Sequence, residues 1–140
     1  MTVTVNSIVT PQKPFSKTAV ASTADVAWNA PVNVQTLIDE TVSGNNDNGL
    51  RITSLIAITR ATLAAALNCA IYKKVGSTYT LIDSALLGAV TPSATVANGK
   101  IDFGYSDDNP LILEAGVGLA VAIGTTIANG VVFRASGGAY

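Results

Sequence analysis

Few side chains in this sequence have the chemistry of a catalytic site. The chain contains no histidine, and Cys69 is its single cysteine. Without histidine, the usual base that activates a cysteine or serine nucleophile is missing, and zinc sites built from cysteine and histidine are excluded. We therefore expect Cys69 to be a small buried apolar residue. We also expect a protein that is not an enzyme and that carries no cofactor.

The carboxylates are the remaining groups that could do chemistry. Asp102, Asp107 and Asp108 lie within a short span, so their oxygens could surround a calcium ion. Adjacent aspartates before Asn-Pro are also typical of a solvated turn, which is the interpretation that we prefer. Glu40 and Glu114 both border predicted loops, whereas acid–base catalysis needs two carboxyls in one cleft. We assign no metal ligand and no catalytic residue.

The charge of the chain is unusually low. Of its 140 residues only 12% are charged and 49% are hydrophobic, with a net charge of −1, whereas a soluble domain has about 25% charged residues. This balance gives no basic surface to hold a phosphate backbone, so we expect no nucleic-acid partner. A length of 140 residues predicts one domain. We expect its charge-poor surface to pack against other protein, beginning with further copies of itself.

Nothing in the sequence predicts a membrane partner. Residues 1–7 have neither the basic region nor the apolar run of a signal peptide. Residues 115–133 are uncharged and long enough to span a bilayer, but four glycines, two threonines and an asparagine interrupt them. We expect two strands around a polar turn there. A lone cysteine and no signal indicate synthesis in a reducing cytoplasm.

Alternating apolar and polar residues predict short strands along most of the chain. In the clearest, residues 50–59, the alternation places Leu50, Ile52, Ile56 and Ile58 on one face and Arg51, Thr53 and Thr59 on the other. A hairpin is predicted between residues 67 and 87, with Gly76 and Ser77 as a type II′ turn and with Lys73 and Lys74 at an exposed tip. Further strands are expected at residues 15–21, 32–39, 100–105, 111–114, 118–123 and 130–136, and a loop at the Ala-rich residues 61–66.

These elements predict an all-β protein, an antiparallel β-sandwich of about eight to ten strands with jelly-roll topology. Pro11 and Pro14 divide the chain into an extended N-terminal arm, residues 1–14, and a single β-sandwich domain, residues 15–140. Within the arm, Thr2, Val3, Thr4 and Val5 alternate like a strand that could pair with a neighbouring subunit or with its own domain. Trp28 precedes Pro31 in a loop, and we expect its side chain to fill the core.

Four stretches in the second half of the chain form a recognisable pattern: residues 50–62, 69–74, 109–121 and 133–140, the last being Phe-Arg-Ala-Ser-Gly-Gly-Ala-Tyr, a strand followed by a Gly-Gly-x-Tyr tail. Together they resemble small virion structural proteins of tailed bacteriophages. The resemblance is one of pattern, without a diagnostic motif, and covers about residues 49–140. Residues before it resemble no family that we can name.

The resemblance implies a capsid cement or decoration protein located in the virion and made in the host cytoplasm, or another head or tail component. Its partners would be further copies of the chain, as a trimer, and other virion proteins such as the major capsid protein. The candidate interaction residues are Thr2, Val3, Thr4 and Val5 in the arm and Phe133 and Tyr140 near the C-terminus. A carbohydrate-binding or receptor-binding β-sandwich module is the alternative, although its tyrosines are scattered in sequence.

Overall fold

A computed structural model of the chain describes residue 11 and residues 13–140. These residues form nine strands and no helix. The strands are β1 (Lys13–Ala21), β2 (Gln35–Ile38), β3 (Leu50–Thr59), β4 (Leu67–Val75), β5 (Thr78–Leu87), β6 (Lys100–Asp102), β7 (Leu111–Leu113), β8 (Gly118–Ile123) and β9 (Val131–Ala139). The all-β class and the expected number of strands are confirmed.

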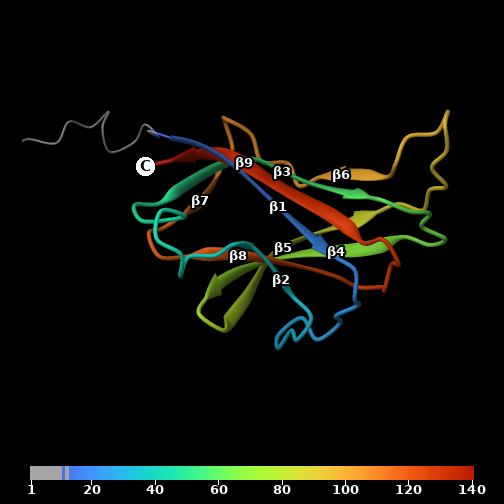
Figure 1. The fold of residues 1–140 in the computed structure, drawn as a ribbon, viewed down its shortest axis with the longest axis horizontal. Coiled ribbons are helices and arrows are strands. Elements are labelled where there is room, and N and C mark those ends of the chain that lie inside the picture. The colour runs from blue at the N-terminus through green and yellow to red at the C-terminus, as the bar shows by residue number, and fades with distance from the viewer. Residues whose placement is uncertain (1–10, 12) are drawn as a thin grey trace, which may run out of the picture.

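The strands form two antiparallel sheets that pack face to face as a β-sandwich (Figure 1). Sheet I has the order β1-β9-β3-β6, with β7 also paired to β3, and sheet II has the order β2-β8-β4-β5. The ladder pairs are nested along the chain: β4 pairs with β5, β3 with β6, β2 with β8 and β1 with β9. Two more ladders, β3 with β9 and β4 with β8, join these pairs into sheets.

The core lies between the sheets and consists of aliphatic side chains with one fully buried phenylalanine. Phe133 of β9 is 0% exposed and its ring centroid lies 6.4 Å from that of Phe103. Cys69 of β4 is fully buried in the same core, as expected, and burial raises the pKa of its thiol to about 12. The thiol is therefore protonated near neutral pH and is a poor nucleophile.

A β-bulge in β3 makes one prediction wrong. Its register against β9 shifts between Ile52 and Ser54, and an extra residue in a strand reverses which side chains face the core. Leu50 and Ile52 are buried as predicted, but beyond the bulge the buried residues are Leu55, Ala57 and Thr59. Ile56 and Ile58 therefore lie on the opposite face, where both are only half-buried.

The hairpin between β4 and β5 is as predicted. Val75 pairs with Thr78, which leaves Gly76 and Ser77 as a two-residue loop. Gly76 has a φ of +61°, and no described residue other than glycine has a positive φ. A type I′ turn would need a positive φ at Ser77 as well, so the turn is type II′.

Several strand limits differ from those expected. β1 begins at Lys13, which pairs with Ala139, so the boundary placed after residue 14 falls inside a strand. β2 is shorter than residues 32–39, because a bulge near Leu37 and the loop before Gln35 interrupt the alternation. Gly137 and Gly138 belong to β9 and are not a tail beyond it. Residues 115–133 contain β8, a turn and the start of β9, as predicted.

Gly137 tests how closely the strands of sheet I approach one another. A Cβ atom added there would overlap the backbone carbonyl of Arg51 and lie 3.0 Å from the Cα of Ile52. We expect Gly137→Ala to lower the free energy of unfolding by about 1–3 kcal/mol, the usual loss on overpacking, as measured by urea denaturation. Gly88→Ala is the control, since a Cβ at Gly88 meets nothing within 4 Å. An equal loss in both variants would contradict the packing described here.

Candidate functional site

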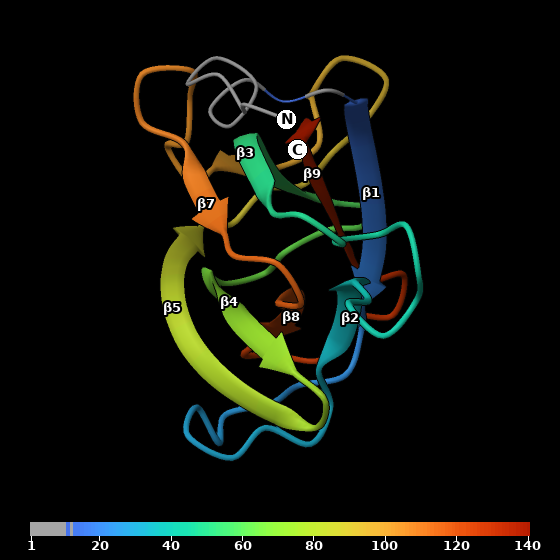
Figure 2. The ribbon, with the colours of Figure 1, turned by 90° about the vertical axis from the view of Figure 1, so that its left-hand side faces the viewer.

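The outer face of sheet II is covered by the chain segment between β1 and β2. Ala70, Tyr72, Ala120 and Ala122 point away from the core, yet each is 0% exposed. Residues 22–34, the covering loop, cross this side of the sheet (Figure 2), and Trp28 and Val34 pack against the four buried side chains. Small residues on β8 and β4 allow the loop to lie close to the sheet.

The carboxylate of Asp25 holds the covering loop in its shape. Its Oδ2 accepts hydrogen bonds from the backbone N–H groups of Val32 at 2.7 Å and Asn33 at 2.8 Å, and its Oδ1 accepts one from Ala27 at 3.2 Å. The Asp25 N–H donates to the carbonyl of Ile123 at the end of β8, at 2.8 Å. The buried carboxylate of Asp25 therefore has hydrogen-bond partners on both of its oxygens, and Asp25 connects both ends of the loop to sheet II.

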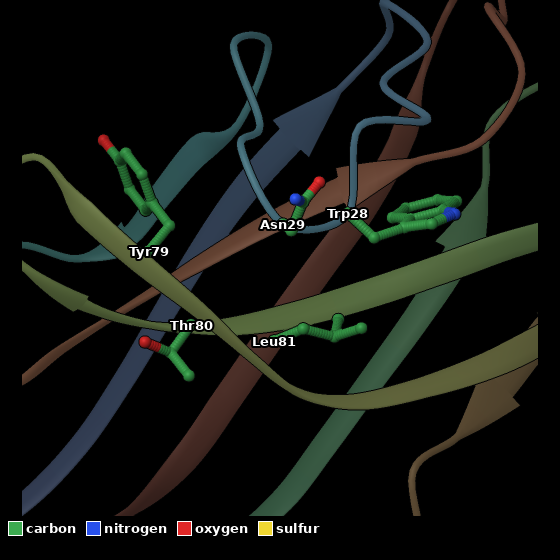
Figure 3. A pocket seen from close by; sticks show the side chains of 5 residues that line it. All are labelled: Trp28, Asn29, Tyr79, Thr80 and Leu81. Carbon is green, nitrogen blue, oxygen red and sulfur yellow. The ribbon is translucent and has the colours of Figure 1, made fainter.

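A groove lies between the covering loop and the end of the β4–β5 hairpin. One cavity, of about 420 Å³, is lined by Trp28 and Asn29 from the loop and by Tyr79, Thr80 and Leu81 from β5 (Figure 3). A second cavity, of about 460 Å³, shares Asn29 and Tyr79 with the first. Its remaining lining residues are Ala30, Pro31, Val32, Ser77 and Thr78. The two cavities are adjacent, with two lining residues in common, and we call them together the groove.

Trp28 does not fill the core, which corrects the expectation from the sequence. It lies on the outer side of sheet II, where a Cβ atom added at Gly124 would be 3.7 Å from its ring. Its side chain is half-buried, so part of the ring is available to a ligand in the groove. The sequence did not associate Trp28 with Tyr79, because residues so far apart are brought together only by the path of the loop.

Tyr72 lies beneath these aromatic residues and has an unusual hydroxyl. The side chain is 0% exposed, and Trp28 and Tyr79 pack against the cluster that contains it. The Tyr72 hydroxyl has no hydrogen-bond partner within the described part of the chain. Burial, with a smaller contribution from the charge of Asp25, raises the pKa of this phenol. A buried hydroxyl without a partner is costly in a protein interior.

Lys74 is not at an exposed tip, as the sequence had suggested, but is buried in an ion pair. Its Nζ lies 2.5 Å from Glu40 Oε1 and 3.7 Å from Asp39 Oδ1, and only 9% of the Lys74 side chain and 5% of the Glu40 side chain are exposed. β4 runs between β8 and β5, so Lys74 is flanked by Gly118 and Tyr79. Gly118 has no side chain to obstruct Glu40.

The surroundings of Lys74 fix its charge. Burial alone would lower the pKa of Lys74, but the hydrogen bond and the negative charge of Glu40 outweigh burial and hold the pKa above its ordinary value. The folded state therefore favours the protonated amine, and this contribution to stability is lost only as the pH rises through the raised pKa. Near neutral pH, Glu40 neutralises the cation beside Tyr79.

Neighbouring carboxylates have simpler surroundings. Hydrogen bonds from Thr41 lower the pKa of Asp39. The hydrogen bond that Lys73 donates to Glu114, at 2.9 Å, lowers the pKa of Glu114. Both shifts favour the ionised form, so their contribution is present above the ordinary pKa and falls as the pH drops through the lowered one. Glu40 and Glu114 have separate lysine partners, Lys74 and Lys73.

The aspartates considered as calcium ligands have partners within the protein. Asp102 Oδ1 accepts a hydrogen bond from the Gly104 N–H at 2.8 Å. Asp107 Oδ1 lies 3.4 Å from Arg51 Nη1, and the backbone carbonyl of Asp107 accepts a hydrogen bond from the same guanidinium. Asp108 is exposed in the same turn. The described residues contain no group of three or more acidic or cysteine side chains placed to hold a metal ion.

Of the six predicted interaction residues, two lie among the residues that the structure describes. Thr2, Val3, Thr4 and Val5 lie outside the described residues. Phe133 is fully buried in the core, so its side chain cannot contact a partner, and that expectation is wrong. Tyr140 is half-buried against its own domain, where its N–H donates to the Gly49 carbonyl at 3.1 Å.

The outer face of sheet I presents a row of aliphatic side chains. Val20 of β1 pairs with Val132 of β9, and Val132 pairs with Ile58 of β3, so the three lie side by side across the sheet. We call these residues the aliphatic row. Val20 is 38% exposed and the other two are half-buried, in contrast to the fully buried outer residues of β4 and β8, Ala70, Tyr72, Ala120 and Ala122. The row ends at Lys100 of β6.

Removal of the Asp25 carboxylate should release the covering loop. We expect Asp25→Ala to lower the free energy of unfolding by about 2 kcal/mol or more, because hydrogen bonds to a buried charge are lost. The emission of Trp28, the only tryptophan, should shift to longer wavelength in the folded variant. Asp108→Ala, at an exposed aspartate, is the control. Unchanged emission in Asp25→Ala would contradict the role of this carboxylate.

Adjacent lysines allow a test of the buried ion pair. Lys74→Met leaves Glu40 buried without its partner, so we expect a loss of about 3–5 kcal/mol in urea denaturation. Lys73→Met removes an exposed pair and should cost about 1 kcal/mol or less. The double variant Lys74→Met with Glu40→Leu should recover most of the loss, since no uncompensated charge remains. Equal losses in both single variants would show that Lys74 is not buried in an ion pair.

Comparisons of the chain with protein-family models, with curated proteins and with solved structures found no significant match. Among the described residues there is no helix with the length and apolar character needed to cross a membrane. The two surfaces defined above, the groove on sheet II and the aliphatic row on sheet I, are therefore the features from which a function is inferred.

Proposed function

We propose that this protein is a non-enzymatic virion structural protein, a capsid cement or decoration protein of a tailed bacteriophage. The aliphatic row on the outer face of sheet I is the observation that carries the proposal. A sheet face with aliphatic side chains aligned across three strands offers a flat apolar surface to another subunit. The resemblance of residues 49–140 to small phage virion proteins supports the same function.

The physical basis of such binding is burial of apolar area. Each Å² of apolar surface removed from water contributes about 25 cal/mol before the costs of association are subtracted. Thr18 and Arg134 lie in the adjacent register position, where Arg134 pairs with Ile56. Polar and charged side chains therefore border the row, as is usual at the rim of an interface. Weak contacts of this kind become strong when many copies bind one closed lattice.

The nested pairing of the strands supports a jelly-roll topology. A chain whose first half pairs antiparallel with its second half, around one central hairpin, forms a long ribbon. Here β4 and β5 are the central hairpin, and the β3–β9 and β4–β8 ladders wind that ribbon into two sheets. Double-sheet jelly rolls occur in viral capsid proteins and in lectins, so the topology is compatible with the proposal without selecting it.

The partners in this proposal are further copies of the chain, as a trimer, and other virion proteins such as the major capsid protein. The predicted arm, residues 1–14, leads into β1 of sheet I, which begins at Lys13. Thr2, Val3, Thr4 and Val5 would extend the sheet of a neighbouring subunit through backbone hydrogen bonds. A place elsewhere in the phage head or tail would use the same contacts.

Self-association tests the proposal directly. We expect light scattering over a hundredfold range of concentration to give the mass of a trimer for the wild-type protein. Val132→Lys places a charge in the middle of the aliphatic row and should shift the protein to monomer, because the charge would have to be desolvated on association. The melting temperature of the variant is recorded to verify that it is folded, because Val132 is half-buried on the outer face of the sheet.

Val42→Lys is the matched control, because Val42 is 50% exposed in a loop outside the row. It should remain a trimer. Co-sedimentation with expanded empty phage heads then examines the partner: wild type and Val42→Lys should sediment with the heads, whereas Val132→Lys should stay in the supernatant. A wild-type monomer at every concentration that also fails to sediment with heads would overturn the proposal.

A further inference from the structure

We infer that the groove between the covering loop and the β4–β5 hairpin binds a neutral oligosaccharide of at least two sugar rings. This inference concerns sheet II and is independent of the proposed function, which rests on the opposite side of the sandwich. It follows from the chemical character of the lining, from the shape of the groove and from the aromatic cluster beneath it.

The lining of the groove is uncharged and mainly apolar, and it includes several residues with polar side chains. Asn29, Ser77, Thr78 and Thr80 supply an amide and three hydroxyls, each able both to donate and to accept a hydrogen bond. None of the residues that line either cavity carries a charge. The nearby cation of Lys74 is paired with Glu40 at 2.5 Å. Such a lining suits sugar hydroxyls, which also donate and accept, and it offers no counter-ion to a phosphate, sulfate or carboxylate.

The groove also has aromatic side chains in its lining. Trp28 and Tyr79 are each half-buried and belong to the lining, and Figure 3 shows Asn29 between them in that view. A ring held in this way offers one face to an apolar surface at little cost in conformational entropy. The C–H faces of a pyranose ring provide such a surface, while its hydroxyls project sideways towards polar neighbours. An aliphatic ligand would leave the amide and hydroxyls without partners.

The length of the groove sets the size of the ligand. Two adjacent cavities, of about 420 and 460 Å³, share Asn29 and Tyr79 in their linings. Each belongs to the size range of small-molecule sites. Ligand in both would contact the covering loop on one side and β5 on the other. A chain of two or more sugars therefore fits the arrangement better than one sugar.

Tyr72 is part of the cluster on which Trp28 and Tyr79 pack. Its hydroxyl is fully buried and lacks a partner among the described residues. A core built only for stability would place phenylalanine there, because an unsatisfied hydroxyl lowers stability. Tyr72 lines neither cavity, so it supports the two aromatic residues of the groove and does not itself contact the ligand.

The single tryptophan provides a reporter inside the site. We would titrate the full chain with cellotriose, maltotriose, mannotriose and chitotriose while recording the emission of Trp28. We expect saturable change with at least one of these neutral trisaccharides. Tyr79→Ala should weaken that binding about tenfold, the loss expected when one aromatic contact is removed, and keep the tryptophan reporter.

Two exposed leucines on β5 test whether a side chain must line the groove to affect ligand binding. Leu81 lines the groove and is 42% exposed, whereas Leu86 is 63% exposed and lies outside the lining. Leu81→Ala should weaken binding several-fold, and Leu86→Ala should leave it unchanged. Thermal unfolding of each variant verifies that it is folded. Val132→Lys should bind the trisaccharide like wild type, so that failure of this inference and failure of the proposed function are distinguishable.

Three results would overturn the inference. The first is no response of Trp28 to any of the four trisaccharides at millimolar concentrations. The second is a response that Tyr79→Ala and Leu81→Ala leave unchanged. The third is binding of a peptide of residues 1–12 of this chain to the groove without binding of any trisaccharide, which would identify the groove as a docking site for the arm.

Discussion

Burial of sheet II on both faces is the constraint on which the rest of the structure depends. An antiparallel sheet commonly packs one face on the core and exposes the other to water. Here β4 and β8 are buried on both sides, with Leu67, Cys69 and Ile71 in the core and Ala70 and Tyr72 beneath the covering loop. Val26 and Val32 of the loop are exposed and do not anchor it by packing, whereas Asp25 holds the loop through backbone hydrogen bonds. The groove is the space between the covering loop and the end of the β4–β5 hairpin.

The two sides of the sandwich are consequently different surfaces. Sheet I leaves the aliphatic row, Val20, Val132 and Ile58, open to solvent, whereas sheet II carries a loop with an aromatic and uncharged groove. A subunit that docks through sheet I would therefore direct its groove away from the surface it covers. Docking and ligand binding would not compete for the same residues, and each can be altered by substitution without the other.

The sequence predicted what depends on neighbours along the chain and missed what depends on distant ones. The turn at Gly76-Ser77 could be predicted from these two residues alone, because glycine tolerates the positive φ that a type II′ turn needs. The bulge in β3 escaped detection because aliphatic residues occupy both faces beyond it, so that alternation fits two registers there. Lys74 was misplaced because its partner, Glu40, approaches across β8. The groove requires residues 28–32 and 77–81 together, and their spacing in the sequence carries no sign of that contact.

A ligand in the groove would also change the stability of the fold, because it would contact both the covering loop and β5. Its binding free energy would be lost on unfolding, so a ligand at one hundred times its dissociation constant adds about 2.7 kcal/mol to the free energy of unfolding. That amount is comparable to the contribution expected of hydrogen bonds to a buried carboxylate such as Asp25. Ligand and Asp25 would thus act on the same element, the covering loop. Asp25 joins the two ends of the loop, whereas the groove is lined by its middle, residues 28–32, so a ligand there would stabilise the part of the loop between the hydrogen bonds of Asp25.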